Sequence, residues 1–510
     1  MKVKTHYWSF FAALLITHGC QKSKSKVTGP TEQNIQLGLE GTEIADTELP
    51  TLPLSTDTLT CLQPLDPSCS DQIRVNQELS KIFSSYRQPD GTMTSCQDQD
   101  FGQLEQCRKT ELQFRRAEAR ATSRKKRILI IDDGMELPAL TRYQQQVLDI
   151  LKISSNGDVV PEYDEGGTGL FIPALHAEAL QQLGSQDKYI TSKSLHLLAK
   201  DFRAYFRYSS NYTTTGPFSP FGHGSQILVK LADSIPDAQF VVLHHPRQGL
   251  DLPAELYCSM GSVNVEEWSK KVKAFYGQAI QSIQNEIIER YEINYINASF
   301  GHSYPKLKQS WESVCGNVAM PSDESINRYF DLLAVYYQKL GSFDQVLTVQ
   351  AGLEATEGQA MLPPVCRLKA PQRLIADVAM REVDRPVSVE GDQPNGANVD
   401  RSLSLCGDVF LHADVASPYE MGEHAVDYDI FGFDRGYAYP ATHSSYIAPI
   451  VLAHAVYLQS RQPQAIAELI AGLKAKPVRA PWRFAQIPAC DLDERICQKD
   501  ALFVERQDSL

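Results

Sequence analysis

Three short segments of the chain carry side chains of the types that a serine nucleophile needs. Asp132 follows an apolar run and precedes a glycine turn, His223 lies between two glycines, and Ser445 opens an apolar stretch. A serine hydroxyl becomes nucleophilic when a histidine takes its proton and a carboxylate fixes the tautomer of that histidine. Catalytic sets of this kind occur in the order Asp, His, Ser along a chain, among other orders. The sequence therefore predicts Asp132, His223 and Ser445 as a catalytic triad.

Each segment, taken alone, also has a purely structural explanation. An acid at the end of a strand often forms a turn, and a serine at a helix N-terminus is often only a cap. An esterase with a G-x-S-x-G turn is disfavoured, because His443 and Ile447 stand at the two glycine positions around Ser445 and the serine comes last of the three. The combination of the three segments favours the triad.

The elements that must position these residues alternate between strands and helices. Short β-branched runs typical of buried parallel strands occupy residues 127–131, 239–243, 293–300, 345–349 and 409–411. Helical patterns cover residues 137–153, 192–207, 223–232, 265–291, 324–340 and 445–460. This alternation predicts an α/β fold: a three-layer, doubly wound, mostly parallel sheet flanked by helices. Catalytic groups in such sheets gather beyond the carboxyl ends of the strands.

The local sequences around the three residues resemble those of the subtilase family of serine peptidases. Residues 132–134 (Asp-Asp-Gly) look like the family's Asp-Ser/Thr-Gly, and residues 223–225 (His-Gly-Ser) look like His-Gly-Thr. Residues 445–449 (Ser-Tyr-Ile-Ala-Pro) look like Ser-Met-Ala-x-Pro. Two flanking segments, 236–240 and 296–301, are also similar to family segments. The resemblance covers about residues 128–460 and implies a subtilisin-like fold that hydrolyses peptide bonds through an acyl-enzyme.

The same resemblance implies where a peptide substrate would bind. Residues 296–301 (Ile-Asn-Ala-Ser-Phe-Gly) are similar to the family strand whose backbone pairs with the substrate chain. Ser299, Phe300, Gly301 and Gly352 are therefore the expected substrate-binding residues that line the cleft. Calcium, which commonly stabilises subtilases, is an expectation of the resemblance alone, and no metal ligand is predicted.

Two departures from the family pattern bear on activity. Leu353 stands where subtilases carry the asparagine that donates a hydrogen bond to the oxyanion, and His443 stands where they carry a glycine. Gln350 is a nearby amide that could substitute for the asparagine, although it is expected to point elsewhere. The alternative to a serine endopeptidase is thus a catalytically weak or inactive lipoprotein of the same fold that serves as a binding or scaffold protein.

The N-terminus has the pattern of a secretory signal that ends in a lipidation site. Lys2 and Lys4 precede an apolar run over residues 7–16, which is too short for a comfortable membrane span, and Cys20 directly follows a glycine. This resembles a bacterial lipobox, although Thr17 and His18 depart from it, and an ordinary cleaved signal is the alternative. The sequence predicts an exported lipoprotein, anchored through Cys20 to a membrane in the periplasm or at the cell surface.

Composition divides the chain into four parts. We expect a signal peptide over residues 1–19, then a linker and N-terminal extension over 20–125 that could be a pro-segment. The catalytic domain is expected over 126–462 and a C-terminal extension over 463–510. The basic stretch at 108–127 predicts a helical connector or a processing site.

The cysteines bear on the compartment of the protein, and the net charge bears on its class of partner. Apart from Cys20, the 11 cysteines leave an even number, which favours disulfides and an oxidising compartment. Adjacency suggests the pairs Cys258–Cys315 and Cys366–Cys406, and zinc is disfavoured because no C-x-x-C pair is present. Three further cysteine pairs lie close in sequence: Cys61 with Cys69, Cys96 with Cys107, and Cys490 with Cys497. The net charge of -13 argues against nucleic acid, so a peptide or protein substrate is the expected partner.

Overall fold

The structure is a computed structural model that describes the following residues: 77–79, 81–82, 108–119, 126–135, 137–162, 171–184, 223–235, 237–244, 252–261, 264–353, 361–379, 406–412 and 444–475. All of them belong to one of the two units of the chain, Pro53–Leu510. Cys20, His443, the helix predicted over 192–207 and the three close cysteine pairs lie outside the described residues, so those predictions stay predictions. Among the helices that are described, none combines the length and the apolar character that a membrane span requires.

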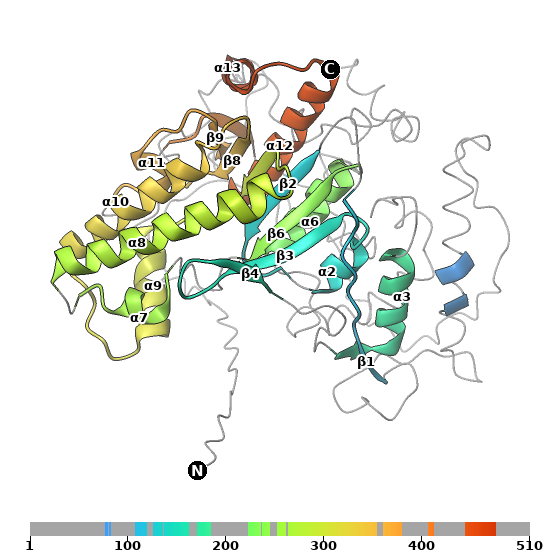
Figure 1. The fold of residues 1–510 in the computed structure, drawn as a ribbon, viewed down its shortest axis with the longest axis horizontal. Coiled ribbons are helices and arrows are strands. Elements are labelled where there is room, and N and C mark those ends of the chain that lie inside the picture. Colours follow the sequence, from blue (N-terminus) through green and yellow to red (C-terminus); the bar gives the residue numbers. More distant parts are fainter. Residues whose placement is uncertain are drawn as a thin grey trace, which may run out of the picture. The chain divides into compact units, whose positions relative to one another are not determined.

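The core of the described chain is an eight-stranded sheet in the order β10-β9-β8-β7-β2-β6-β3-β4 (Figure 1). Every neighbouring pair is parallel except β3 with β4. The strands are β2 (Arg127–Asp132), β3 (Val147–Ile153), β4 (Val159–Pro161), β6 (Gln239–His244), β7 (Tyr295–Ala298), β8 (Leu347–Ala351), β9 (Arg373–Ala379) and β10 (Val409–His412). The predicted α/β fold with a mostly parallel sheet is confirmed.

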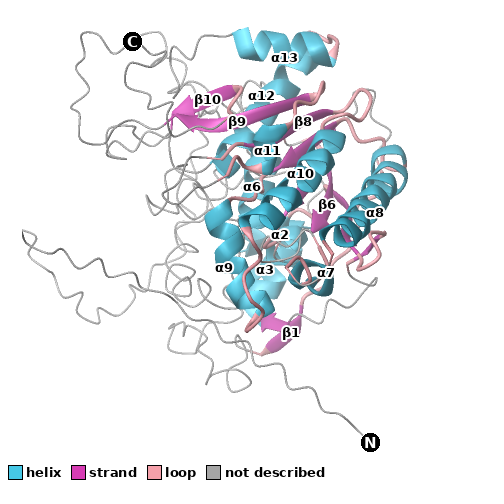
Figure 2. Cartoon of the chain, turned by 90° about the vertical axis from the view of Figure 1, so that its left-hand side faces the viewer, coloured by secondary structure: helices cyan, strands magenta, loops and turns pink. Residues whose placement is uncertain are grey.

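Helices cover both faces of the sheet and make the three layers (Figure 2). Because side chains alternate along a strand, Ile128 and Ile130 of β2 belong to one buried cluster, and Leu129 and Ile131 belong to the other. The first cluster lies under α2 (Leu137–Arg142), α3 (Ala174–Gly184), α6 (His223–Ser234), α12 (Ser444–Arg461) and α13 (Ile466–Ala475). The second lies under α7 (Ala254–Cys258), α8 (Val265–Ile283), α9 (Tyr304–Cys315) and α10 (Asp323–Leu340).

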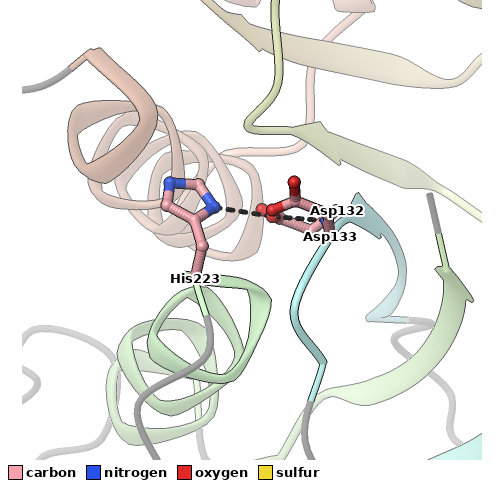
Figure 3. A group of neighbouring side chains, drawn as sticks. All are labelled: Asp132, Asp133 and His223. Carbon is pink, nitrogen blue, oxygen red and sulfur yellow. Dashed lines mark hydrogen bonds and ion pairs between the residues drawn. The ribbon is translucent and has the colours of Figure 1, made fainter. Parts of the chain in front are cut away.

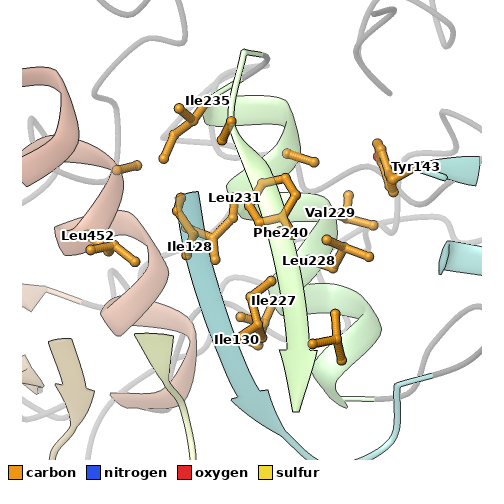
Figure 4. Close-up of a cluster of buried hydrophobic side chains, with 14 of the residues drawn as sticks. Ile128, Ile130, Tyr143, Ile227, Leu228, Val229, Leu231, Ile235, Phe240 and Leu452 are labelled. Atoms are coloured by element: carbon orange, nitrogen blue, oxygen red, sulfur yellow. The ribbon is translucent and has the colours of Figure 1, made fainter. Parts of the chain in front are cut away.

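The first cluster fixes the two helices that matter for the site. Figure 4 shows Leu231 of α6 beside Ile128 of β2 and Ile227 of α6 beside Ile130, with Leu452 on the neighbouring α12. These side chains are fully buried. Burying such a side chain contributes about 1.5–3 kcal/mol. The apolar faces of α6 and α12 therefore hold the N-terminal ends of both helices over the same sheet.

One predicted helix is wrong. The stretch at 137–153 was expected to be a single helix, but α2 ends at Arg142 and residues 147–153 form β3. Val147, Ile150 and Leu151 satisfy helical spacing, yet this segment is a buried strand that pairs with β6 along its length. The helix predicted over 265–291 also ends early, because α8 passes at Gln284 into a π-helical turn, Gln284–Glu289.

The segment preceding the first core strand contains a short strand and no helix over residues 109–119, so the helical connector predicted there is wrong for these residues. β1 (Lys109–Glu111) pairs antiparallel with β5 (Phe171–Pro173). Leu112 is fully buried. The backbone N–H of Ala117 donates to Val147 O at 2.8 Å, and Arg116 Nε lies 3.0 Å from Asp149 Oδ1. The compact body of the protein therefore includes residues that precede position 126.

Both disulfides suggested by adjacency are confirmed. Cys258 at the end of α7 bonds to Cys315 at the end of α9, and Cys366 bonds to Cys406 just before β10. The second disulfide joins α11 (Pro364–Arg367) to the outermost strand of the sheet. Disulfides persist in oxidising compartments, so both bonds are consistent with export.

Candidate active site

Backbone hydrogen bonds bring the start of α6 against the turn that follows β2. The N–H of Gly224 donates to Asp133 O at 2.7 Å, and the N–H of Ser225 donates to Gly134 O at 3.4 Å. Gly134 has a φ of 62°, which favours glycine at this turn. Two N–H groups of the first helical turn thereby find partners that the helix itself cannot supply. His223, the first residue of α6, is placed beside Asp132 by this contact.

Gly224 is required by the closeness of that contact. A Cβ at this position would lie 2.7 Å from Asp133 O and 3.1 Å from Asp132 Cβ. Only a residue without a side chain allows the turn after β2 and the start of α6 to approach this closely.

We expect Gly224→Ala to lower the free energy of unfolding by about 1–3 kcal/mol, since the added methyl must push the turn or the helix aside. Gly277→Ala is the matched control. A Cβ at this helical glycine of α8 meets no atom within 4 Å. Its substitution should stabilise the protein by up to about 1 kcal/mol through helix propensity. Urea denaturation of both variants checks the pair, and equal effects of the same sign would contradict the assigned role of Gly224.

The three residues predicted as a triad form one chain of hydrogen bonds. His223 Nδ1 lies 2.6 Å from Asp132 Oδ1, and His223 Nε2 lies 2.9 Å from Ser445 Oγ. Figure 3 shows the imidazole, carried by α6, pointing toward the carboxylates at the end of β2. The N–H of Asp133 also donates to Asp132 Oδ1, at 2.8 Å. Both ring nitrogens of His223 are thus within hydrogen-bond reach of the groups that the sequence assigns to them.

Burial and charge set the protonation of the pair. Asp132 is fully buried, and burial raises the pKa of its carboxyl to about 6 even though His223 lowers it. For His223, burial alone would lower the pKa, but the charge and hydrogen bond of Asp132 raise it above its usual value. Asp133 adds to this rise, and the exposed Lys306 at the start of α9 opposes it. Near pH 8 the carboxyl is ionised and can hold the proton of His223 on Nδ1.

The carboxylates of Asp132 and Asp133, together with His223, could also be metal ligands. Asp132, Asp133 and His223 each offer one ligand atom, and these atoms lie within 4.8 Å of one another. However, Nδ1 of His223 already makes the hydrogen bond to Asp132, and Nε2 faces Ser445. A metal would have to displace one of these bonds, so the arrangement fits proton transfer better than metal ligation.

Ser445 lies in the first turn of α12, and two further serines fix this end of the helix. Ser444 Oγ donates to the backbone oxygen of Gly352, just beyond β8. Ser299 Oγ, just beyond β7, donates to the backbone oxygen of Ser445 at 2.8 Å. The N-terminus of α12 is therefore tied to the carboxyl ends of two adjacent parallel strands.

The side chains of Ser299 and Phe300 are both buried. Ser299 is 2% exposed and its hydroxyl is directed at Ser445, whereas Phe300 is 8% exposed with its ring 5.6 Å from that of Tyr337. Any contact of these two residues with a substrate would therefore come from their backbone, which is how the resemblance assigned it.

Gly301 and Leu353 face each other across the ends of β7 and β8. A Cβ at Gly301 would meet three carbon atoms of Leu353 at 3.1–3.2 Å. Gly352 is packed more closely still, since a Cβ there would meet the buried carboxylate of Asp377 at 2.6 Å. The side chain of Leu353 thus covers the glycine at the end of the expected substrate strand.

Gln350, the amide that the sequence offered as a possible donor, faces away from the site. It is 1% exposed, and its Oε1 accepts from Arg373 Nη1 at 3.4 Å. Arg373 in turn bonds to the backbone of the α11 region, at Val365 and Leu368. Its strand neighbours Val349 and Ala351 face the cluster beneath α12, so Gln350 lies on the opposite face of the sheet from Ser445.

Tyr446 is a site residue that the sequence argument did not single out. Its ring centroid lies 5.3 Å from that of His223, and Lys230 Nζ lies 5.7 Å from the same tyrosine ring. Subtilases carry methionine at the corresponding place in the Ser-Met-Ala-x-Pro motif, so the motif comparison signalled only an apolar neighbour. The aromatic ring here packs against the imidazole.

Comparison with known proteins identifies no family for the chain. No family model matches it, and no curated protein matches it. Among solved structures, it is similar to the nisin leader peptidase NisP from Lactococcus lactis, at 10% sequence identity. That match covers 69% of this chain and 82% of the NisP chain, with a TM-score of 0.28. At this distance the match carries no argument about function, which must be made from the residues of this chain.

Proposed function

We propose that the protein is a serine endopeptidase that cleaves peptide bonds through an acyl-enzyme on Ser445. The observation that carries the proposal is the hydrogen-bond chain Asp132–His223–Ser445, with distances of 2.6 and 2.9 Å, from three segments far apart in sequence. A serine, a histidine and a buried acid in this order of contact are the parts that nucleophilic catalysis by serine requires.

In the proposed mechanism each of the three residues has a distinct role. Asp132 accepts a hydrogen bond from the Nδ1–H of His223, which leaves the Nε2 lone pair facing the hydroxyl of Ser445. As Ser445 Oγ bonds to the substrate carbonyl carbon, its proton passes to Nε2, and Asp132 stabilises the imidazolium that results. The imidazolium then gives this proton to the amine that leaves when the peptide bond breaks. A water molecule repeats the sequence on the acyl-enzyme and releases the carboxylic acid.

The oxyanion that forms on the substrate needs hydrogen-bond donors. Ser445 lies in the first turn of α12, where N–H groups have no intrahelical partner and the helix dipole favours negative charge. Its own N–H is therefore the natural donor. The side chain of Leu353, which packs against Gly301, donates nothing, so the proposed site has a weaker oxyanion hole than a site with an amide there.

Fluorophosphonate labelling of the purified protein near pH 8 tests the proposal. The reagent should form a covalent adduct on Ser445, located by peptide mass spectrometry, and Ser445→Ala should abolish it. Ser460→Ala, at the opposite end of the same helix, is the matched control and should label like the unaltered protein. Labelling that survives Ser445→Ala, or no labelling at all, would overturn the assignment of Ser445 as the nucleophile.

Leu353 favours a second candidate, a binding or scaffold protein built on the same fold with little or no activity. Such a protein would retain the hydrogen-bond chain but turn over slowly, because the oxyanion lacks a side-chain donor. Intact casein and peptide libraries after long incubation, with a partner whose binding survives Ser445→Ala, would favour this candidate over the peptidase.

We further propose that the protein is exported and held to a membrane by a lipid on Cys20. The sequence around Cys20 supports export and lipidation. The disulfides Cys258–Cys315 and Cys366–Cys406 support an oxidising compartment. In fractionated cells, the fluorophosphonate-labelled protein should be found with the membranes, and Cys20→Ser should release it. Equal membrane retention of Cys20→Ser would contradict the anchor.

A further inference from the structure

The carbonyl of Ser445 lacks the hydrogen bond that an α-helix normally supplies. In a helix this oxygen would accept from the N–H of the fourth residue along, which is Pro449. Proline has no N–H, and its ring also crowds the carbonyl of the residue four positions earlier. The helix backbone therefore supplies no hydrogen bond from residue 449 to the carbonyl oxygen of the nucleophilic residue.

Ser299 supplies the missing donor from outside the helix. Its hydroxyl donates to the Ser445 carbonyl oxygen at 2.8 Å. Asn297 Nδ2, in β7, donates to Ser299 Oγ at 2.8 Å. Because the amide occupies a lone pair of the hydroxyl oxygen, the hydroxyl proton remains directed at Ser445. Asn297 and Ser299 are 0% and 2% exposed, so water competes little for these bonds.

We propose that Ser299, oriented by Asn297, is a positioning residue that fixes the backbone of the nucleophile by replacing the hydrogen bond that Pro449 cannot make. The proposal rests on the proposed function and extends it to two residues of the expected substrate strand. Ser299 touches neither His223 nor the Ser445 hydroxyl in the described contacts. It acts through the backbone of Ser445, setting the direction of Oγ toward His223 Nε2.

A double-mutant cycle between Ser299 and Pro449 tests this directly. Ser299→Ala should slow inactivation by fluorophosphonate about tenfold, the size of one lost hydrogen bond to the backbone that positions the nucleophile, with little change in reagent binding. Pro449→Ala restores a backbone N–H that can bond to the Ser445 carbonyl. In that background, Ser299→Ala should slow inactivation by less than about threefold. Ser269→Ala, which alters another buried serine, on α8 across the sheet, is the control and should leave inactivation unchanged.

The cycle can also be measured without any activity, which separates this inference from the proposed function. In the Ser445→Ala protein the backbone carbonyl of position 445 remains. There, Ser299→Ala should lower the urea midpoint of unfolding more in the presence of Pro449 than with Pro449→Ala. If Ser299 and Pro449 are coupled in stability but the unaltered protein is not labelled, the peptidase proposal is overturned and the hydrogen-bond role of Ser299 stands. Equal effects of Ser299→Ala in both backgrounds, in inactivation and in unfolding, would overturn the positioning role.

Discussion

Asp132→Asn is expected to lower kcat about 10⁴-fold, the loss that this substitution causes in a serine-peptidase triad. The amide fits the same space, but its NH₂ can face Nδ1 and turn the imidazole to the tautomer that carries its proton on Nε2. That nitrogen could then no longer accept from Ser445 Oγ, 2.9 Å away. The substitution also removes the charge and hydrogen bond of Asp132 that raise the pKa of His223. The acid limb of the pH profile should therefore move to lower pH, because His223 stays neutral at a more acidic pH.

Asp133→Asn is the matched control for this prediction. Asp133 is the next residue and its charge also raises the pKa of His223, but its described contacts to the site are made by its backbone. We expect a change in kcat of less than about tenfold with a small shift of the acid limb in the same direction. If Asp132, Asp133 and His223 held a catalytic metal, both substitutions would be equally damaging. Steady-state kinetics of the two variants across pH 5–9 distinguish these outcomes.

Leu353→Asn is expected to raise kcat by about 10²–10³-fold, the effect of one side-chain donor in an oxyanion hole. Residue 353 follows Gly352, whose backbone oxygen accepts from Ser444, and its side chain reaches Gly301 beyond the neighbouring strand. An amide at this position would lie between the two segments that hold the nucleophile. Asparagine is close to leucine in shape, so the contact with Gly301 can be kept.

Leu353→Asp separates the hydrogen bond from the change in shape. The carboxylate has nearly the same outline as the amide but carries no N–H donor, and its negative charge opposes an oxyanion. We expect no gain, or a further loss, in kcat for this variant with KM changed little. A gain for both variants would show that relief of packing around Gly301 matters, and no gain for Leu353→Asn would show that position 353 does not face the oxyanion.

The sequence was sufficient for the parts of the fold that depend on local pattern. The buried β-branched run before Asp132 and the runs at β6, β7 and β8 are continuous and short, and the amphipathic helix before Leu340 is long and regular. The prediction of one helix over 137–153 was wrong because the spacing of its apolar residues fits both the helical and the strand period. Pairing with β6, which is a tertiary contact, decides for the strand.

The candidate site also combines features that the sequence predicts with features that only tertiary contacts decide. Residue type and order were enough to select Asp132, His223 and Ser445, whose side chains the structure brings together. The inward direction of the Ser299 hydroxyl, the packing of Tyr446 on His223 and the contact of Leu353 with Gly301 depend on how separate segments meet. No spacing along the chain encodes these contacts.

The docking of residues 108–119 determines what proteolytic processing at the basic stretch would produce. A protease that cuts after Arg124, Lys125, Lys126 or Arg127 would sever the chain on the carboxyl side of β1 and the segment following it. β1 would still pair with β5, and Leu112 would still be buried in the core. Cleavage there would yield a nicked, two-chain protein whose fragments stay associated, and maturation would not by itself shed the upstream polypeptide.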